Sequence, residues 1–183
     1  VEPVTDTAGI SIALGDADTD GVLNESDTGI PLTVSVTNPA DGAAGSITSD
    51  LYLRIDGTEG LGMGTLSGVS YTTQTISGDA DIPDGTYYVV TGVDMGDTLD
   101  LVFTPATMTA GDVTVAAWVR NVETGAAEIV STGTQTLTVE KSNDGVSVDA
   151  TPVSGREAAD STNASLIEID LSSLALNDND GSE

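Results

Sequence analysis

The chain has 183 residues, and its 30 acidic residues against only four basic ones give a formal net charge of −26 at pH 7. Because nucleic acids and anionic membranes are bound through clustered lysine and arginine, this charge excludes both as partners. The absence of cysteine and histidine also removes disulfides, thiolate chemistry and the commonest general base at neutral pH. The composition therefore favours cations as ligands, and it suits an extracellular protein that is stabilised by metal ions instead of disulfides.

Hydrophobic residues make up 38% of the chain, which is enough for a buried core. With one Trp, one Phe and four Tyr, that core must be mainly aliphatic. The longest apolar runs, such as residues 87–90, are far shorter than the ~20 residues of a membrane-spanning helix. We therefore expect a folded domain that does not insert into a membrane.

Apolar and polar residues alternate along most of the chain. This is the pattern of strands with one buried and one solvent-facing side in antiparallel sheets. The alternating segments are, in chain order, residues 10–14, 32–36, 51–55, 99–103, 113–119 and 137–139. Turn sequences such as Asp56-Gly57 and Asp84-Gly85 separate them, and no segment has convincing helical spacing. The sequence predicts an all-β antiparallel β-sandwich, with a closed barrel as the alternative.

Between the first two of these strands lies the acidic segment 16–27, DADTDGVLNESD. Its spacing is that of the twelve-residue calcium loop of EF-hands and dockerins. The expected ligands are the carboxylates of Asp16, Asp18, Asp20 and Asp27 and the backbone carbonyl of Val22, with Gly21 at the sharp bend and Leu23 as the apolar anchor. Hard oxygen donors favour Ca²⁺ over zinc or magnesium. Because strands flank the loop, we expect the ion to lock a strand connection and not to act as a sensor.

Other acidic residues are further candidates for metal or ligand binding. A second cluster, Asp178, Asp180 and Glu183, follows a predicted strand in the same way, so the sequence predicts several calcium ions. Candidates with weaker spacing are Glu2, Asp6, Asp56, Glu59, Asp79, Asp81 and Asp84, for which solvated turns are the alternative interpretation. The glycine-rich segment 56–70 is predicted to be a long loop between strands, a common place for binding on a sandwich.

The chain is predicted to contain two parts. Residues 1–141 form a calcium-binding β-sandwich domain that ends on a strand at 134–140. Residues 142–183 comprise a polar linker, a strand at 166–171 and the second acidic loop. This tail either packs back on the sandwich or opens the next repeat of a longer chain, and the sequence leaves both arrangements open.

Three stretches resemble the large repetitive RTX-type adhesins that bacteria export by type I secretion, the group that includes biofilm and ice-binding adhesins. They are VEPVTD at 1–6, GTYYVV at 85–90 with residues 99–105 as a central hairpin, and DNDGSE at 178–183. The resemblance implies immunoglobulin-like sandwiches strung along the bacterial cell surface, which fold outside the cell when they meet calcium and have neighbouring domains of the same chain as partners. The glycine-aspartate nonapeptide repeats and the repetitive threonine arrays of ice-binding faces are missing, so we expect neither a secretion-signal region nor contact with ice.

Two functions are compatible with this resemblance. The chain is either a ligand-binding domain that holds a peptide or carbohydrate through calcium during attachment, or a spacer that calcium stiffens. Asp79, Asp81, Asp84 and the loop at 56–64 are the candidate ligand-binding residues of the first interpretation. We do not expect an enzyme, because histidine and cysteine are absent and the acidic residues lie in turns suited to metal ligation and not as a pair in a cleft.

Overall fold

The computed structural model describes residues 7–16, 22–37, 48–57, 63–122 and 127–141, and two short pieces at 146–147 and 175–176. The chain divides into two compact units, Val1–Lys141 and Ser142–Glu183. In the second unit, β10 (Val146–Ser147) pairs antiparallel with β11 (Ala175–Leu176). The predicted strand at 166–171 lies outside the described residues.

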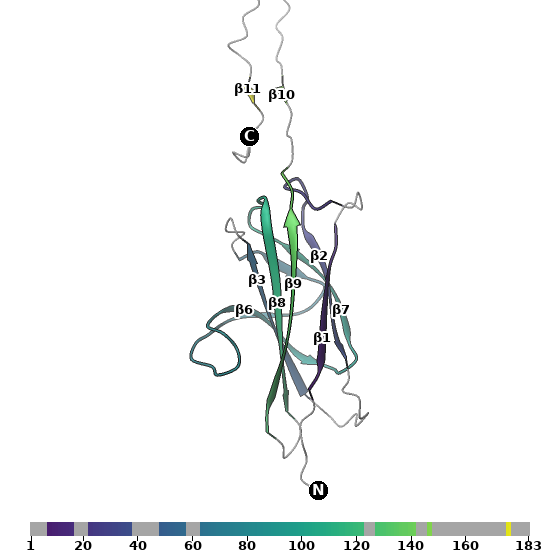
Figure 1. The fold of residues 1–183 in the computed structure, drawn as a ribbon, viewed down its shortest axis with the longest axis vertical. Helices are drawn as coiled ribbons and strands as arrows, with labels where there is room; N and C mark the ends of the chain where they lie inside the picture. The colour runs from purple at the N-terminus through teal and green to yellow at the C-terminus, as the bar shows by residue number, and fades with distance from the viewer. Residues whose placement is uncertain are drawn as a thin grey trace, which may run out of the picture. The chain divides into compact units, whose positions relative to one another are not determined.

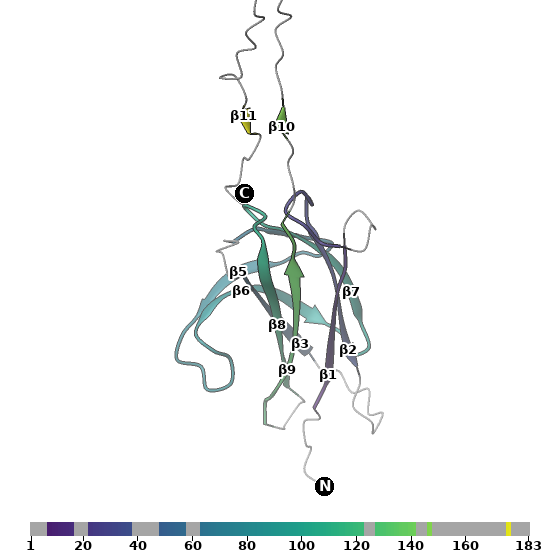
Figure 2. The same ribbon diagram turned by 45° about the horizontal axis from the view of Figure 1, so that its top comes forward.

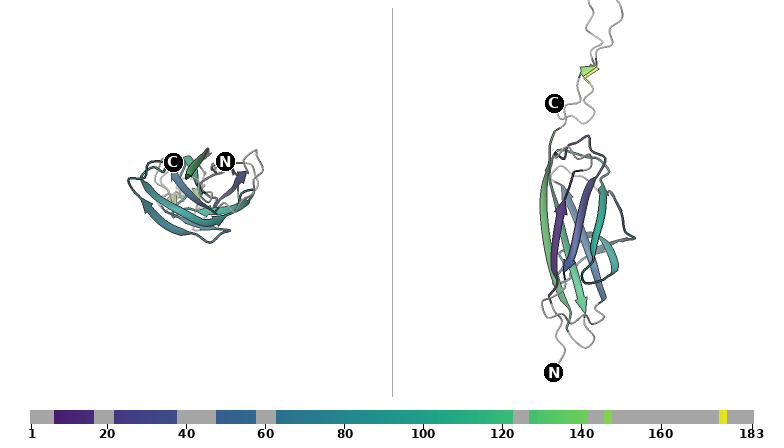
Figure 3. Two further views of the ribbon diagram at one scale, coloured as in Figure 1. Left: turned by 90° about the horizontal axis from the view of Figure 1, so that it is seen from below. Right: turned by 90° about the vertical axis from the view of Figure 1, so that its right-hand side faces the viewer.

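The first unit consists of two antiparallel sheets that lie face to face (Figures 1 and 3). The four-stranded sheet has the order β1 (Gly9–Leu14), β2 (Ile30–Thr37), β7 (Thr98–Thr104) and β4 (Thr65–Ser67). The five-stranded sheet has the order β5 (Thr72–Ile76), β6 (Gly85–Val93), β3 (Thr48–Gly57), β8 (Gly111–Val122) and β9 (Ile129–Val139). The prediction of an all-β sandwich is confirmed, and two separate sheets exclude the closed barrel.

The strand order is immunoglobulin-like. The strands β1-β2-β7-β4 correspond to the A-B-E-D sheet of an immunoglobulin domain, and β3, β8 and β9 correspond to strands C, F and G. The hairpin of β5 and β6 extends the second sheet beyond β3, where variable-type domains carry two additional strands. Here β4 precedes this hairpin in the chain, whereas strand D of a variable-type domain follows the two added strands.

A single core fills the space between the sheets, because alternate residues of each long strand point inward. In β2 the inward set is Ile30, Leu32, Val34 and Val36, and in β8 it is Val113, Val115, Ala117 and Val119. Leu51 and Leu53 of β3 complete the opposite wall, and all these side chains are buried. The core is mainly aliphatic, as the composition predicts, with Tyr88 and Phe103 as its aromatic members. Removing this apolar surface from water is the main force that holds the sheets together.

Two details of the sequence prediction are wrong. Residues 85–90 and 99–105 do not form a hairpin, because β6 pairs with β3 and β5 whereas β7 pairs with β2 and β4. Each strand has an apolar face for the core, so the chain crosses between sheets through a turn at 94–97, which exchanges backbone hydrogen bonds with Val36. The segment 56–70 is also not a continuous loop, since β4 lies within it and pairs with β7.

Three polar residues are buried on the inner face at one end of the five-stranded sheet. Ser49 Oγ donates a hydrogen bond of 2.9 Å to Asn121 Oδ1, so Ser49 is satisfied. Ser131 lies on the neighbouring strand β9, and its buried Oγ has no hydrogen-bond partner. A buried hydroxyl without a partner loses its hydration without compensation. Two serines with similar burial therefore make opposite contributions to stability.

We expect Ser131→Ala to leave the free energy of unfolding unchanged or to raise it by about 1 kcal/mol, because the substitution removes an unsatisfied hydroxyl. Ser49→Ala is expected to lower the same free energy by about 1–2 kcal/mol, because it leaves Asn121 Oδ1 buried without its donor. Urea unfolding followed by circular dichroism measures both values. Equal losses in the two variants would contradict the assignment of the Ser131 hydroxyl as an unsatisfied group.

Candidate functional sites

The closing half of the predicted calcium loop is fixed against the end of the sandwich. Leu23 is only 3% exposed and belongs to the main core, so its predicted role as the anchor is confirmed. Glu140 N donates to Leu23 O at 2.8 Å, and Glu25 N donates to Glu140 O at 3.2 Å, which ties the loop to the end of β9. Glu25 Oε1 also accepts a hydrogen bond of 2.8 Å from Ala110 N. These contacts hold the loop in one position relative to both sheets.

Asp27, at the closing position of the loop, is buried, and no described residue forms an ion pair with it. It is 8% exposed, and its Oδ2 accepts a hydrogen bond of 2.8 Å from Asn24 N. None of the ion pairs among the described residues involves Asp27. An ionised carboxylate in such surroundings is costly unless it is paired, hydrogen-bonded or bound to a metal.

The other loop residues fit a calcium site in part. Asp16 follows β1 and is partly buried, and Val22 is 41% exposed. Asn24 Oδ1 is engaged by Ser26, and the Val22 carbonyl accepts from Asn24 Nδ2 at 3.4 Å. Asp18 and Asp20 lie outside the described residues, as do Glu2, Asp6, Glu59 and the second cluster of Asp178, Asp180 and Glu183. Within the described part of the chain, no group of three or more acidic side chains is placed to hold a metal ion.

The acidic residues at 79–84 lie in the loop between β5 and β6, which is visible in Figure 2. Asp79 Oδ1 accepts hydrogen bonds of 3.0 Å from the backbone N–H groups of both Asp81 and Ile82. Asp84 Oδ1 accepts one of 2.7 Å from Gly78 N, and Gly78 adopts a φ of 72° that favours glycine. The carboxylates of Asp79 and Asp84 therefore hold the loop in its shape.

This loop packs over the outer face of the five-stranded sheet. Ile82 is completely buried against Tyr52, Tyr87 and Trp118, which form a second hydrophobic cluster separate from the main core. The rings of Tyr87 and Trp118 meet edge to face with their centroids 5.4 Å apart. The Tyr87 hydroxyl donates a hydrogen bond to the Pro83 carbonyl, which fastens the returning half of the loop. An outer face of this kind is normally solvated in a sandwich, so its burial here is a specific feature of this chain.

Two of the four basic residues of the chain lie on this same face. The guanidinium of Arg54 lies 5.6 Å from the ring centroid of Trp118, and that of Arg120 lies 5.6 Å from the ring centroid of Tyr52, which are cation–π distances. Arg54 Nε donates to Asp56 Oδ2 at 2.7 Å, which gives the exposed Asp56 an ion-pair partner. Arg120 Nη2 donates to Asp79 Oδ2 at 2.6 Å.

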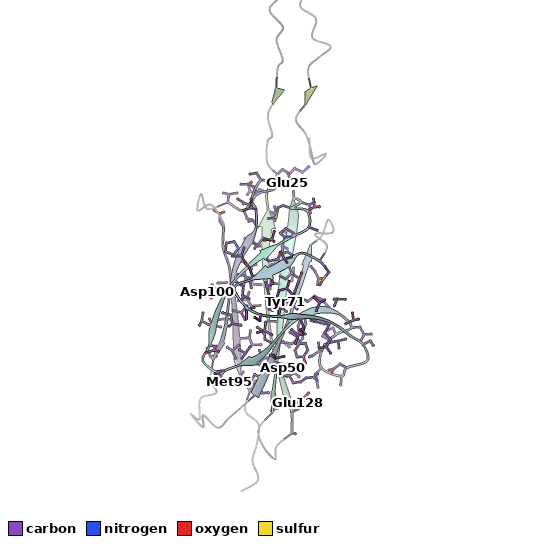
Figure 4. The ribbon with its side chains drawn as sticks, turned by 180° about the vertical axis from the view of Figure 1, so that it is seen from behind. Glu25, Asp50, Tyr71, Met95, Asp100 and Glu128 are labelled. Atoms are coloured by element: carbon purple, nitrogen blue, oxygen red, sulfur yellow. The ribbon has the colours of Figure 1, made fainter. Side chains whose placement is uncertain are left out.

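Arg120 is the centre of a small charge network. Its Nε lies 3.0 Å from Glu128 Oε1, although this pair is not in hydrogen-bond geometry. The hydrogen bond from Arg120, together with those from the backbone of Asp81 and Ile82, lowers the pKa of Asp79 from 3.8 to about 2. Burial raises the pKa of the nearby Tyr52 phenol, which therefore stays protonated. Figure 4 shows Glu128 and Glu25 at opposite ends of the sandwich, so this network lies far from the predicted calcium loop.

A pocket of about 350 Å³ opens beside this network. Its lining includes Tyr52 of β3, Gln74 and Thr75 of β5, Ser77 and Asp79 of the loop, and Arg120 of β8. This volume lies near the lower end of the range of about 300–1,000 Å³ found for small-molecule sites. Of the pocket residues, only Asp79 was predicted from the sequence as a candidate for ligand binding.

The outer-face cluster has a signal in the sequence besides the apolar periodicity of the strands. Tyr52 and Arg54 alternate with the core residues Leu51, Leu53 and Ile55, and Trp118 and Arg120 alternate in the same way on β8. Large aromatic residues at solvent-facing positions of two neighbouring strands indicate a second buried surface. The position of β5 carried no such signal, because its sequence TTQTI lacks apolar alternation.

No family model and no curated protein matches the chain. Among solved structures, AggA, the major subunit of aggregative adherence fimbriae type I from Escherichia coli, matches with a TM-score of 0.36 and 16% identity over 75% of this chain and 98% of that one. A DUF4466 family protein from Parabacteroides merdae matches with a TM-score of 0.36 and 14% identity over 73% and 46%. No conclusion about function follows from similarities at this level. The described residues contain no helix that is long and apolar enough to cross a membrane.

We expect the pKa of Asp79 to be about 2 and to rise towards 3.8 in Arg120→Gln, because the substitution removes its strongest hydrogen bond. NMR titration of the carboxyl carbon measures both values. Since the folded-state pKa lies below the ordinary value, the stabilisation from Asp79 is present above about pH 4 and is lost as the pH falls towards 2. Arg54→Gln is the control, because Arg54 pairs with Asp56. An Asp79 pKa that is the same in wild type and Arg120→Gln would show that the ion pair is absent in solution.

Proposed function

We propose that the chain is a calcium-stabilised, immunoglobulin-like module of a secreted bacterial adhesin of the RTX type, acting at the cell surface in attachment. The observation that carries the proposal is Asp27: a carboxylate at the closing position of a twelve-residue calcium loop, buried to 8% exposure and with no arginine or lysine among the described residues to neutralise it. The acidic composition, the absence of cysteine and the anchored Leu23 support the same interpretation.

A bound calcium ion would supply positive charge and an oxygen-coordinating centre at this loop. Asp16, Asp18, Asp20 and Asp27 would hold it through carboxylate oxygens, and Val22 would hold it through its backbone carbonyl. These groups repel one another when the ion is absent, which favours an open loop. Because Leu23 and Glu140 connect the loop to the core and to β9, ordering the loop would also order this end of the sandwich.

Within an adhesin, the module is either a binding domain or a spacer. The outer-face pocket and the loop that covers the second cluster favour binding, since a spacer needs neither. The spacer is the second candidate, and it is supported by the calcium loop and by the expected connection to neighbouring domains of the same chain. Attachment is the proposed role in both cases, either by direct contact with a ligand or by projecting another domain.

We expect removal of calcium with EGTA to lower the melting temperature of the full chain. A ligand that binds only the folded state stabilises it by about 2.7 kcal/mol per site when its concentration is about 100 times its Kd. Differential scanning calorimetry in excess calcium and in EGTA measures the effect, and magnesium at the same concentration is the ion control. Identical melting curves in calcium and in EGTA would refute calcium stabilisation.

Asp27→Asn is expected to change the response to calcium in a characteristic way. The amide oxygen still accepts the hydrogen bond from Asn24 N, but the buried negative charge is lost. We therefore expect a higher melting temperature than wild type in EGTA and a smaller gain when calcium is added. Asp94→Asn is the matched control, because it removes an equal charge from an exposed turn at the end of β6. If the two variants respond to calcium alike, Asp27 is not a ligand.

A further inference from the structure

The pocket on the outer face has a balanced charge in a molecule that is otherwise strongly acidic. Arg120 and Asp79 are the charged residues of its lining, and they are paired with each other at 2.6 Å. Gln74 and Ser77 contribute an amide and a hydroxyl group, whereas the Thr75 hydroxyl lies 3.3 Å from Thr86 Oγ1 on the other face of the sheet. The lining therefore combines hydrogen-bond donors and acceptors without net charge, which matches a neutral polar ligand.

Tyr52 contributes a further hydrogen-bonding group to the pocket. The residue as a whole is only 7% exposed, but its hydroxyl is not one of the buried polar atoms that lack a partner, so this group keeps contact with solvent. Tyr52 lines the pocket, so its hydroxyl can exchange a hydrogen bond to water for one to a ligand hydroxyl.

The charged pair excludes other classes of ligand. Asp79 Oδ1 accepts two hydrogen bonds from the backbone of Asp81 and Ile82, and Oδ2 is paired with Arg120, so the charge of Asp79 is already compensated and attracts a cationic group only weakly. Arg120 faces Asp79 and Glu128, so it has no excess positive charge to attract an anion. The formal net charge of −26 adds a long-range repulsion of anions. Polar groups in the lining disfavour a wholly apolar ligand.

The pocket is also rigid on one side and accessible on the other. Hydrogen bonds from Ile82 N to Asp79 Oδ1 and from the Tyr87 hydroxyl to the Pro83 carbonyl fix the covering loop. Arg120 connects Asp79 to β8, so the lining from the loop and from β8 is preorganised. Gln74 and Thr75 lie exposed on β5, which is the edge strand of its sheet. A ligand can approach over this edge without any movement of the covering loop.

We propose that this pocket binds a neutral saccharide unit directly, without a metal ion. A sugar ring carries several hydroxyl groups that both donate and accept hydrogen bonds, as the lining does. The Tyr52 hydroxyl and Gln74 amide contact the sugar, and Arg120 and Asp79 form the fixed polar wall. This inference deepens the binding role proposed above by naming the ligand class, and it places binding at the end of the sandwich away from the calcium loop (Figure 4).

The test is a screen of the full chain in calcium buffer against an array of neutral, sialylated and sulfated glycans, followed by NMR titration of each hit. Tyr52→Phe and Gln74→Ala are each expected to weaken binding of a neutral glycan about two- to tenfold, the effect of one hydrogen bond. Tyr71→Phe and Thr73→Ala are the matched controls, since these residues do not line the pocket, and they should leave affinity unchanged.

Several results would overturn the inference. These are an absence of any glycan binding at millimolar concentration, a preference for charged glycans, or equal affinities in wild type, Tyr52→Phe and Gln74→Ala. Failure of this inference is distinguishable from failure of calcium stabilisation, because the first is read from glycan affinity and the second from melting curves. Asp27 lies at the opposite end of the sandwich from the pocket (Figure 4). Asp27→Asn should therefore bind the glycan with the same affinity as wild type at a temperature where both proteins are folded.

Discussion

The shortage of positive charge is the constraint that organises this molecule. Thirty carboxylates share four basic side chains, so most acidic residues must be solvated, hydrogen-bonded to the backbone or neutralised from outside the chain. The structure concentrates Arg54 and Arg120 on one outer face of the five-stranded sheet, where each pairs with an acid and lies near aromatic rings. No basic side chain of the described residues pairs with Asp27. The two candidate sites therefore differ in whether the protein itself supplies positive charge to the acidic residue.

The two candidate sites differ in the groups that stabilise their carboxylates. On the outer face, Asp79 is stabilised from within the protein by Arg120 and by two backbone N–H groups, and its lowered pKa reports that stabilisation. At the loop end, Asp27 receives one hydrogen bond from the backbone of the described residues. The first arrangement is complete in the folded chain and leaves a neutral polar pocket. The second lacks positive charge, which is why a divalent cation is the proposed partner there.

The loop that covers the second hydrophobic cluster also forms one wall of the pocket. In most antiparallel sandwiches the outer faces are solvated, so binding residues must come from loops. Here the loop between β5 and β6 returns over the sheet, and Ile82 buries Tyr87 and Trp118 from solvent. The same folding-back brings Asp79 to Arg120 and thereby forms one wall of the pocket. Packing of an apolar side chain thus positions the polar groups.

Strand periodicity is a local property, so the sequence by itself determined the all-β class, the buried faces of β2, β3, β8 and β9, and the anchoring of Leu23. It did not determine β5, because TTQTI has no apolar alternation. The separation of β6 and β7 into different sheets was decided by tertiary structure, since either strand could pair with several partners that offer a similar apolar face. The pairing of Asp79 with Arg120, 41 residues apart, and the isolation of Asp27 from every arginine in the described chain also required the fold. Residue spacing carries no information about distances across a sheet, and these distances decide which carboxylate receives a positive charge.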